Sequence, residues 1–217
     1  MKNVISMALC IAILGLSWAC AEIDNTQTGA ILGAAAGGAL GAQLYKDKPL
    51  VGAAIGAAAG ALAGAVIGNY LDRKLKSAQE TAKSYKYSPS QGTMVKVEDV
   101  HMEPNVIRPG QKAKLVINYA LLNSDPNRTV PVRETRQILS DSRSLKKIGP
   151  LSKNRNAGTY VTEQEVTFPQ NIPAAMYTLN GTVEAGGKTS SKLAGFRVTM
   201  VRGDQGILYA SQNMRQP

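Results

Sequence analysis

Residues 29–43 read GAILGAAAGGALGAQ and residues 51–74 read VGAAIGAAAGALAGAVIGNYLDRK. In both stretches glycine recurs every fourth residue, and alanine fills most of the positions between. A repeat of four is a helical period, whereas a strand repeats every second residue and a flexible linker keeps no register. The charged segment KDKP, residues 46–49, separates the two rows with a helix-breaking proline. The sequence therefore predicts a hairpin of two helices over residues 28–76.

The glycines of this hairpin need a compensating interaction. Each glycine inside a helix costs roughly 0.5–1 kcal/mol relative to alanine. A missing side chain lets the backbone of a neighbouring helix approach closely, as in small-xxx-small contacts. Four residues turn about 400°, so each row winds around its helix and one partner would not use all of it. We therefore expect a homo-oligomer. The predicted packing residues are Gly29, Gly33, Gly37, Gly41, Gly52, Gly56, Gly60, Gly64 and Gly68.

The two helical stretches also have features of membrane segments. No charged residue lies within Thr28–Tyr45 or Pro49–Leu71, and the charges between these segments are confined to the turn that joins them. At about 1.5 Å per residue, the length of each segment fits a bilayer. Tyr45 and Tyr70 lie where interfacial aromatics are typical. Large apolar residues are sparse, however, so the insertion energy is small. Insertion into a membrane is predicted, with a soluble, alanine-rich hairpin as the alternative.

The first 20 residues have the pattern of an export signal. Lys2 is followed by an uncharged apolar run over residues 4–16 and then by small residues, a run too short to span a bilayer. Two cleavage sites fit. Residues 17–20, SWAC, resemble a lipobox, which would make Cys20 the lipid-modified first residue. Residues 19–21, ACA, fit ordinary signal cleavage before Glu22.

Residue content argues against metal and redox chemistry. Cys10 and Cys20 are the only cysteines and both lie in the signal segment, so a disulfide framework and thiolate metal sites are excluded. The single histidine, His101, is too few for a multi-histidine metal site. Residues 187–189, GKT, lack the upstream glycine of a phosphate-binding loop. No cofactor and no catalytic residue is expected, and the chain is predicted not to be an enzyme.

The two glycine rows resemble the glycine-zipper segments of Gram-negative envelope lipoproteins, the YMGG-like two-helix group. The resemblance covers residues 28–75 and ends in GNYLD, residues 68–72, close to the usual ending of those zippers. It implies an outer-membrane-associated, self-associating segment in the cell envelope, outer membrane or periplasm. It implies no catalytic residue.

Beyond a helix end and linker over residues 77–92, the pattern changes to period two. Apolar residues alternate in three runs, and turn residues recur between them. The fold class expected is therefore multi-part: a signal helix, an α-helical hairpin, an all-β sandwich over 93–201 and a flexible tail over 202–217. The alternating residues are Leu115, Ile117, Tyr119 and Leu121; Tyr177, Leu179, Gly181, Val183 and Ala185; and Phe196, Val198 and Met200. The expected turns include Gly149-Pro150 and Gly186-Gly187.

Residues 172–198 resemble the last hairpin of bacterial immunoglobulin-like domains. There a proline precedes a strand that carries a tyrosine, and a glycine turn leads to a final strand with an inward aromatic. Tyr177 is placed like the tyrosine of that corner. The resemblance implies a binding or spacer module.

The formal charge is +10, and the excess is concentrated in one region. Aromatics do not interleave with these basic residues and no nucleic-acid module is visible, so nucleic acid is not expected as a partner. Anionic lipids, an envelope protein or an anionic wall polymer would fit, and a solvated basic surface is the alternative. The basic residues are Arg128, Arg133, Arg136, Arg143, Lys146, Lys147, Lys153 and Arg155.

Two functions follow from these features. The first is a non-catalytic, lipid-anchored envelope protein that assembles through its zipper and presents an immunoglobulin-like domain to other envelope components. The second is a pore-forming or secretion subunit whose hairpins oligomerise in the membrane.

Overall fold

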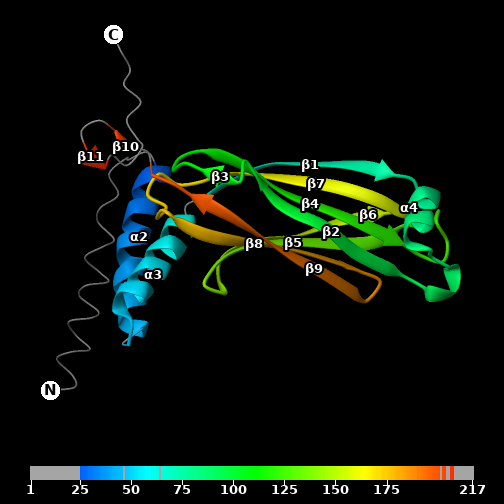
Figure 1. Cartoon of the computed structure of the whole chain (residues 1–217), viewed down its shortest axis with the longest axis horizontal. Helices are drawn as coiled ribbons and strands as arrows, with labels where there is room; N and C mark the ends of the chain where they lie inside the picture. The colour runs from blue at the N-terminus through cyan, green and yellow to red at the C-terminus, as the bar shows by residue number, and fades with distance from the viewer. Residues whose placement is uncertain (1–24, 46, 64, 201, 204–205, 208–217) are drawn as a thin grey trace, which may run out of the picture.

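A computed structural model describes residues 25–45, 47–63, 65–200, 202–203 and 206–207. The predicted export signal, Cys20 and Gly64 lie outside these residues, as does most of the predicted tail. The described chain is mostly β-structure. An elongated sandwich of two sheets carries a pair of helices across one end and a single short helix, α4, at the other (Figure 1).

The glycine rows begin as two helices, α2 (Asn25–Leu44) and α3 (Pro49–Ala63). A short turn joins them, in which the amide of Lys48 donates to the carbonyl of Tyr45 at 3.1 Å. Pro49 occupies the first position of α3, where its missing amide hydrogen costs nothing. None of the helices in the described ranges has the combined length and hydropathy needed to cross a membrane.

The prediction of a second helix extending to Leu71 is wrong. Helix α3 ends at Ala63, and Val66–Lys76 forms strand β1, which pairs antiparallel with β7 (Gly158–Thr167). Gly68 therefore lies in a strand and not in a helix contact. The β-branched pair Val66-Ile67 favours a strand, and β7 offers a full ladder of partners about 90 residues later in the chain.

The sandwich also begins earlier in the chain than residue 93, the predicted start. Because β1 belongs to a sheet, the β domain begins at Val66. The helix end predicted within residues 77–92 is a separate short helix, α4 (Ala78–Tyr85). Ser77 starts it with a capping box, in which the Glu80 amide donates to the Ser77 hydroxyl at 3.2 Å and the Ser77 amide donates to the Glu80 carboxylate at 2.8 Å. A 3-10 turn, Pro89–Gln91, follows.

Two sheets make the sandwich. The four-stranded sheet has the order β1-β7-β4-β2 and the five-stranded sheet the order β3-β9-β8-β5-β6. All neighbours are antiparallel except β3 and β9, which are parallel. The remaining strands are β2 (Met94–Glu103), β3 (Val106–Ile107), β4 (Lys112–Leu122), β5 (Val130–Ser140), β6 (Arg143–Arg155), β8 (Ala175–Ala185), β9 (Lys188–Val198), β10 (Arg202–Gly203) and β11 (Gly206–Ile207).

The predicted alternation is confirmed in β8, whereas in β4 the predicted row is buried but Val116 and Ala120, between its members, are buried too. Leu115, Ile117, Tyr119 and Leu121 are fully buried between the sheets, and so is the row from Tyr177 to Ala185. Phe196 and Val198 are buried in β9, but Met200 lies beyond the strand and is exposed. A side chain on Gly181 would lie 2.7 Å from Val100, so a small residue is required at that point of the core.

One predicted turn is wrong. Gly149-Pro150 lies inside β6 at an irregularity opposite Glu134–Arg136, and the chain reverses earlier at Asp141 and Ser142. Both of these residues have positive φ, as a tight hairpin of this hand requires. The Gly186-Gly187 turn between β8 and β9 is confirmed, again with positive φ at both residues.

Tyr177 fixes the start of β8. Its hydroxyl donates to the carbonyl of Pro173, four residues upstream, at 2.9 Å, and its ring stacks on Phe196 with 5.6 Å between centroids. Burial raises the pKa of this phenol above its ordinary value, so the hydroxyl stays protonated and remains a donor.

Replacing Tyr177 by phenylalanine is expected to lower the free energy of unfolding by about 1 kcal/mol. The ring packing stays, but the carbonyl of Pro173 loses its donor. Urea denaturation followed by circular dichroism would measure the change. The same substitution at Tyr45 is the control and should leave the free energy of unfolding unchanged, because the contact described for Tyr45 is that of its ring with Arg143, which phenylalanine keeps.

Candidate interaction site

Inside the hairpin, helices α2 and α3 meet through their backbone atoms, because the glycines there have no side chains. A Cβ built on Gly56 would lie 2.7 Å from the carbonyl carbon of Gly37 and 3.1 Å from the Cα of Gly41. A Cβ built on Gly41 would lie 2.9 Å from the carbonyl carbon of Gly52. Such distances are too short for any real side chain, so only glycine fits at Gly37, Gly41, Gly52 and Gly56. These four predicted packing residues thus face one another within one chain.

The other predicted packing residues have different surroundings. Gly60 lies beside this contact, with its Cα 3.5 Å from a Cβ built on Gly37. Gly29 and Gly33 lie in the first half of α2. Gly68 in β1 faces the side chain of Glu165.

The outer surface of the hairpin carries its larger apolar side chains. Leu44 and Leu50, on either side of the α2–α3 turn, are 79% and 85% exposed, and Leu40 and Val51 are exposed as well. Burying a leucine fully stabilises by roughly 1.5–3 kcal/mol. This exposed end of the hairpin, defined by Leu40, Leu44, Leu50 and Val51, is called the hairpin tip below.

The opposite face of α3 joins the core of the sandwich. Ala58, Leu62 and Ala65 belong to the same buried cluster as the sheet residues. Lys146 of β6 donates to the carbonyl of Ala63 at 3.2 Å, which caps the last turn of α3. The guanidinium of Arg143 lies 4.1 Å from the centre of the Tyr45 ring. The hairpin is therefore fixed to the end of the sandwich and is not a flexible appendage.

A charged network lies buried between the sheets and ties β1 to them. Glu134 of β5 is 1% exposed, and it accepts hydrogen bonds from the hydroxyls of Tyr119 at 2.9 Å and Tyr70 at 3.1 Å. Arg136, fully buried, pairs with the same carboxylate at 3.2 Å. Arg155 pairs with Glu134 at 3.4 Å and with Asp72 of β1 at 2.7 Å. Two carboxylates thus balance two guanidinium groups.

Protonation of the tyrosines follows from this arrangement. Burial raises the pKa of Tyr119 and Tyr70 above their ordinary value, and the negative charge of Glu134 raises it further. Both phenols therefore remain neutral donors at any physiological pH. The hydroxyl of Thr162 accepts from Arg136 at 2.7 Å, which adds a neutral partner. The network clamps β1 to the two sheets.

Two members of the predicted basic surface belong to this clamp. Arg136 and Arg155 are buried, so the prediction that they lie on a basic surface is wrong. The signal was in the sequence: Val132, Glu134, Arg136 and Ile138 alternate on one face of β5, and the apolar ends of that row indicate the core. Tyr70, expected at a membrane interface, also lies in the clamp and not at an exposed boundary.

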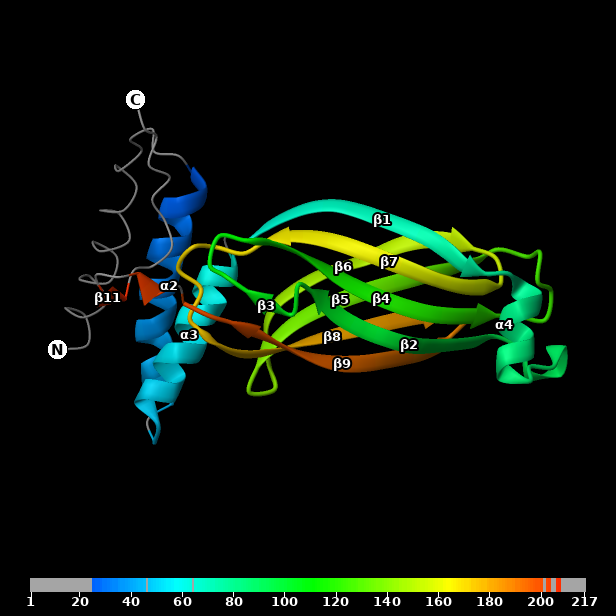
Figure 2. The same ribbon diagram turned by 45° about the horizontal axis from the view of Figure 1, so that its top comes forward.

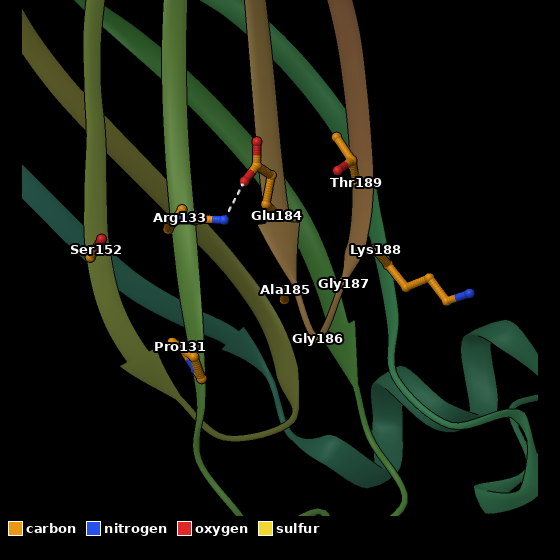
Figure 3. A pocket seen from close by; sticks show the side chains of 9 residues that line it. All are labelled: Pro131, Arg133, Ser152, Glu184, Ala185, Gly186, Gly187, Lys188 and Thr189. Atoms are coloured by element: carbon orange, nitrogen blue, oxygen red, sulfur yellow. Dashed lines mark ion pairs between the residues drawn. The ribbon is translucent and has the colours of Figure 1, made fainter.

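A polar groove of about 610 Å³ lies at the α4 end of the five-stranded sheet. Figure 3 shows Arg133 pointing toward Glu184, its partner at 3.1 Å, while Lys188 points away from them. The groove includes the GKT residues, which form a strand–turn–strand and not the strand–turn–helix of a phosphate loop. It is lined by Pro131, Arg133, Ser152, Glu184, Ala185, Gly186, Gly187, Lys188 and Thr189.

Acidic residues and histidine do not gather into a metal site in the described part of the chain. His101 of β2 contacts Asp99 at 2.6 Å, and both side chains are about half exposed. Glu163 and Glu165 of β7 lie on the outer face of the sheet and pair with Lys114 at 2.9 Å and Lys112 at 3.1 Å.

A sequence family described as YMGG-like Gly-zipper matches residues 1–72. The match supports the glycine-zipper segment and is compatible with a protein associated with a membrane or the cell envelope. It extends past α3 into the first residues of β1. A comparison with curated proteins finds no match.

Solved structures similar to the chain are distant. An alkylpurine DNA glycosylase from Pseudomonas fluorescens aligns at 12% identity and a TM-score of 0.36, over 71% of this chain and 40% of that one. The chain thus spans less than half of the glycosylase. A CARDB domain from Pyrococcus furiosus aligns at 12% identity and a TM-score of 0.31, over 49% of this chain and 87% of that one. The sporulation control protein Spo0M of Bacillus subtilis aligns at 16% identity and a TM-score of 0.26, over 49% of each chain.

Proposed function

We propose that this chain is a non-catalytic lipoprotein of the Gram-negative cell envelope, associated with the outer membrane. It is anchored through Cys20, self-associates through its glycine-zipper hairpin and presents an immunoglobulin-like sandwich as an interaction domain. The observation that carries the proposal is the hairpin tip, an exposed aliphatic surface on helices whose other face is fixed to the sandwich.

The arrangement of the hairpin supports a contact role for its outer surface. Gly37, Gly41, Gly52 and Gly56 pack inside the hairpin, so assembly between copies uses the outer face of α2 and α3. The exposed residues there are mostly alanines and the four aliphatic residues of the tip, with Gln43, Asp47 and Lys48 beside them, and the aliphatic side chains suit either lipid or a neighbouring hairpin. The family match over residues 1–72 is consistent with both partners.

The sandwich supports the second half of the proposal. It combines two sheets, an inward Phe196 and the Tyr177–Pro173 contact, which together are typical of immunoglobulin-like domains. Its basic outer residues, Arg133, Lys146, Lys147 and Lys153, would favour an anionic envelope polymer or lipid headgroup as partner.

Replacing Leu44 and Leu50 together by glutamate is expected to weaken self-association and binding to vesicles of phosphatidylethanolamine and phosphatidylglycerol at least tenfold. Each substitution puts a charge where an aliphatic side chain would be buried. Analytical ultracentrifugation and vesicle flotation measure the two effects. The control is Leu193→Glu, because Leu193 is similarly exposed, at 63%, but lies on β9 of the sandwich. A wild-type chain that neither floats nor associates contradicts the proposal.

A further inference from the structure

Strands β2 and β9 meet along one margin of the sandwich although they belong to different sheets. Figure 2 shows them side by side, with α4 at one end. Two side chains join the strands there. The amide of Val97 donates to the hydroxyl of Ser190 at 2.9 Å, and the ammonium group of Lys192 donates to the carbonyl of Glu98 at 2.6 Å. These bonds run between a side chain and backbone, so the two strands are spaced more widely than neighbours within a sheet.

A groove of about 460 Å³ lies over this junction. Its volume falls within the range of about 300–1,000 Å³ that is usual for small-molecule sites. Tyr85, the last residue of α4, forms one wall of the groove. Lys96 and Glu98 of β2 line it as well, together with Ser190 and Lys192 of β9. The groove therefore combines an aromatic ring, a carboxylate, a hydroxyl and two ammonium groups.

A β-bulge places Glu98 in this groove. The pairing of β2 with β4 shifts between Val97 and Asp99, so Glu98 is the extra residue on β2. A bulge changes the direction of a side chain, and bulges are frequent next to functional sites. The carboxylate of Glu98 accepts from the hydroxyl of Tyr85 at 2.8 Å. Burial and this hydrogen bond raise the pKa of the Tyr85 phenol above its ordinary value, so the phenol remains a neutral donor.

Several donors of the groove are not used within the protein. Lys96 is exposed, and no described residue pairs with its ammonium group. Lys192 has three N–H donors, of which the bond to Glu98 uses one. The hydroxyl of Ser190 accepts from Val97, which leaves its own hydrogen to donate. With two ammonium groups and one carboxylate, the groove has a net positive charge.

We propose that this groove binds an anionic sugar of an envelope glycan. The phosphate or carboxylate of the sugar pairs with Lys96 and Lys192, because ammonium groups form charge-assisted hydrogen bonds with such anions. A hydroxyl of the sugar donates to Glu98, and the half-buried ring of Tyr85 packs against the apolar face of the sugar. An anion without hydroxyls fits less well, because it would face the Glu98 carboxylate without a donor for it.

The groove is separate from the hairpin tip. It lies beside α4, whereas the hairpin crosses the other end of the sandwich (Figure 1). A sugar bound in the groove therefore does not compete with contacts of the tip. The inference rests on the proposed function, because it gives the interaction domain of that proposal a ligand.

A titration of the full-length protein with glucose 6-phosphate and with glucuronic acid tests the proposal. At least one of the two is expected to shift the backbone amide resonances of Lys96, Glu98 and Ser190–Lys192 in nuclear magnetic resonance spectra. That sugar should bind at least about fivefold more tightly than glucose or inorganic phosphate, since charge-assisted bonds and sugar contacts act together. Binding of inorganic phosphate with equal affinity would show an anion site only and overturn the proposal. So would the absence of shifts at these residues with both sugars.

Lysine substitutions test the contacts directly. Lys96→Ala is expected to weaken binding of the sugar about tenfold, the loss of one hydrogen bond to a charged group. Because Lys96 is exposed, the variant should fold like wild type, and unchanged circular dichroism would establish this. The matched control is Lys188→Ala, which removes an exposed lysine of β9 that does not line the groove. An equal loss of binding in both variants would mean that only the overall charge matters and would overturn the site.

One further comparison separates this inference from the proposed function. The Leu44→Glu, Leu50→Glu variant should bind the sugar with wild-type affinity, and Lys96→Ala should bind vesicles as wild type does. Absence of sugar binding in a wild-type chain that floats with vesicles and associates rejects the groove and leaves the proposed function intact. Sugar binding in a chain that neither floats nor associates retains the groove and rejects the role of the hairpin.

Discussion

Replacing Glu134 by alanine is expected to lower the free energy of unfolding by about 3–5 kcal/mol, the usual cost of removing one partner from a buried ion pair. Arg136, with no exposed surface, would lose the only carboxylate that pairs with it among the described residues, and of its two described partners Arg155 would keep the partly exposed Asp72. Tyr70 and Tyr119 would lose their acceptor as well. A domain is typically stable by about 5–15 kcal/mol, so the loss is large.

Urea denaturation followed by far-ultraviolet circular dichroism measures this effect. The matched control is Glu184→Ala, which also breaks a glutamate–arginine pair, at 3.1 Å to Arg133. Its side chains are 41% and 62% exposed, so the expected change is about 0–1 kcal/mol. Equal shifts in the two variants would show that the clamp contributes no more than a surface pair.

Replacing Gly56 by alanine is expected to separate α2 from α3. The new methyl group would overlap the carbonyl of Gly37, and backbone cannot move aside as a flexible side chain can. Overpacking of this kind costs about 1–3 kcal/mol. The gain in helix propensity, about 1 kcal/mol, offsets only part of that. Faster amide hydrogen exchange across both helices would report the loss.

The control for this prediction is Gly38→Ala, in the partner helix α2 but away from the close backbone contact. A Cβ on Gly38 would lie 3.5 Å from the carbonyl oxygen of Ala53 and 3.6 Å from the Cβ of Ala57, which are ordinary distances. It gains the same helix propensity without the clash, so exchange should slow by up to about fivefold, equivalent to about 1 kcal/mol. Similar exchange in the Gly56 and Gly38 variants would mean that close backbone packing does not hold the hairpin.

The periodicity of the sequence correctly predicted those elements whose local residue pattern agrees with the contacts that they make in the tertiary structure. The row from Tyr177 to Ala185 alternates because one face of β8 meets the core. The row from Leu115 to Leu121 in β4 is buried as predicted, although Val116 and Ala120 between its members are buried as well. Glycine spacing placed Gly37, Gly41, Gly52 and Gly56 on contact faces, since a repeat of four keeps one helix face toward its neighbour over short distances.

The same spacing misled the prediction beyond Ala63. The glycine repeat continues through Gly68, yet the chain there is a strand because β7 supplies hydrogen bonds and Glu134 and Arg155 supply partners for Tyr70 and Asp72. Those partners lie 64 to 101 residues away in the sequence, and no local window contains them. The charge of Arg155 suggested a surface for the same reason, since its counter-charges, Asp72 and Glu134, come from other strands.

The sequence by itself determined the two kinds of structure in this protein, a glycine-rich helical segment followed by alternating strands. It could do so because the repeat of a helix or a strand is visible in residues that lie close together in the sequence. Only the tertiary structure decided where helix gives way to strand and which arginines are buried. Each of those outcomes depends on pairing between strands far apart in the chain, where the energy of a buried charge pair or a ladder of hydrogen bonds outweighs local preference.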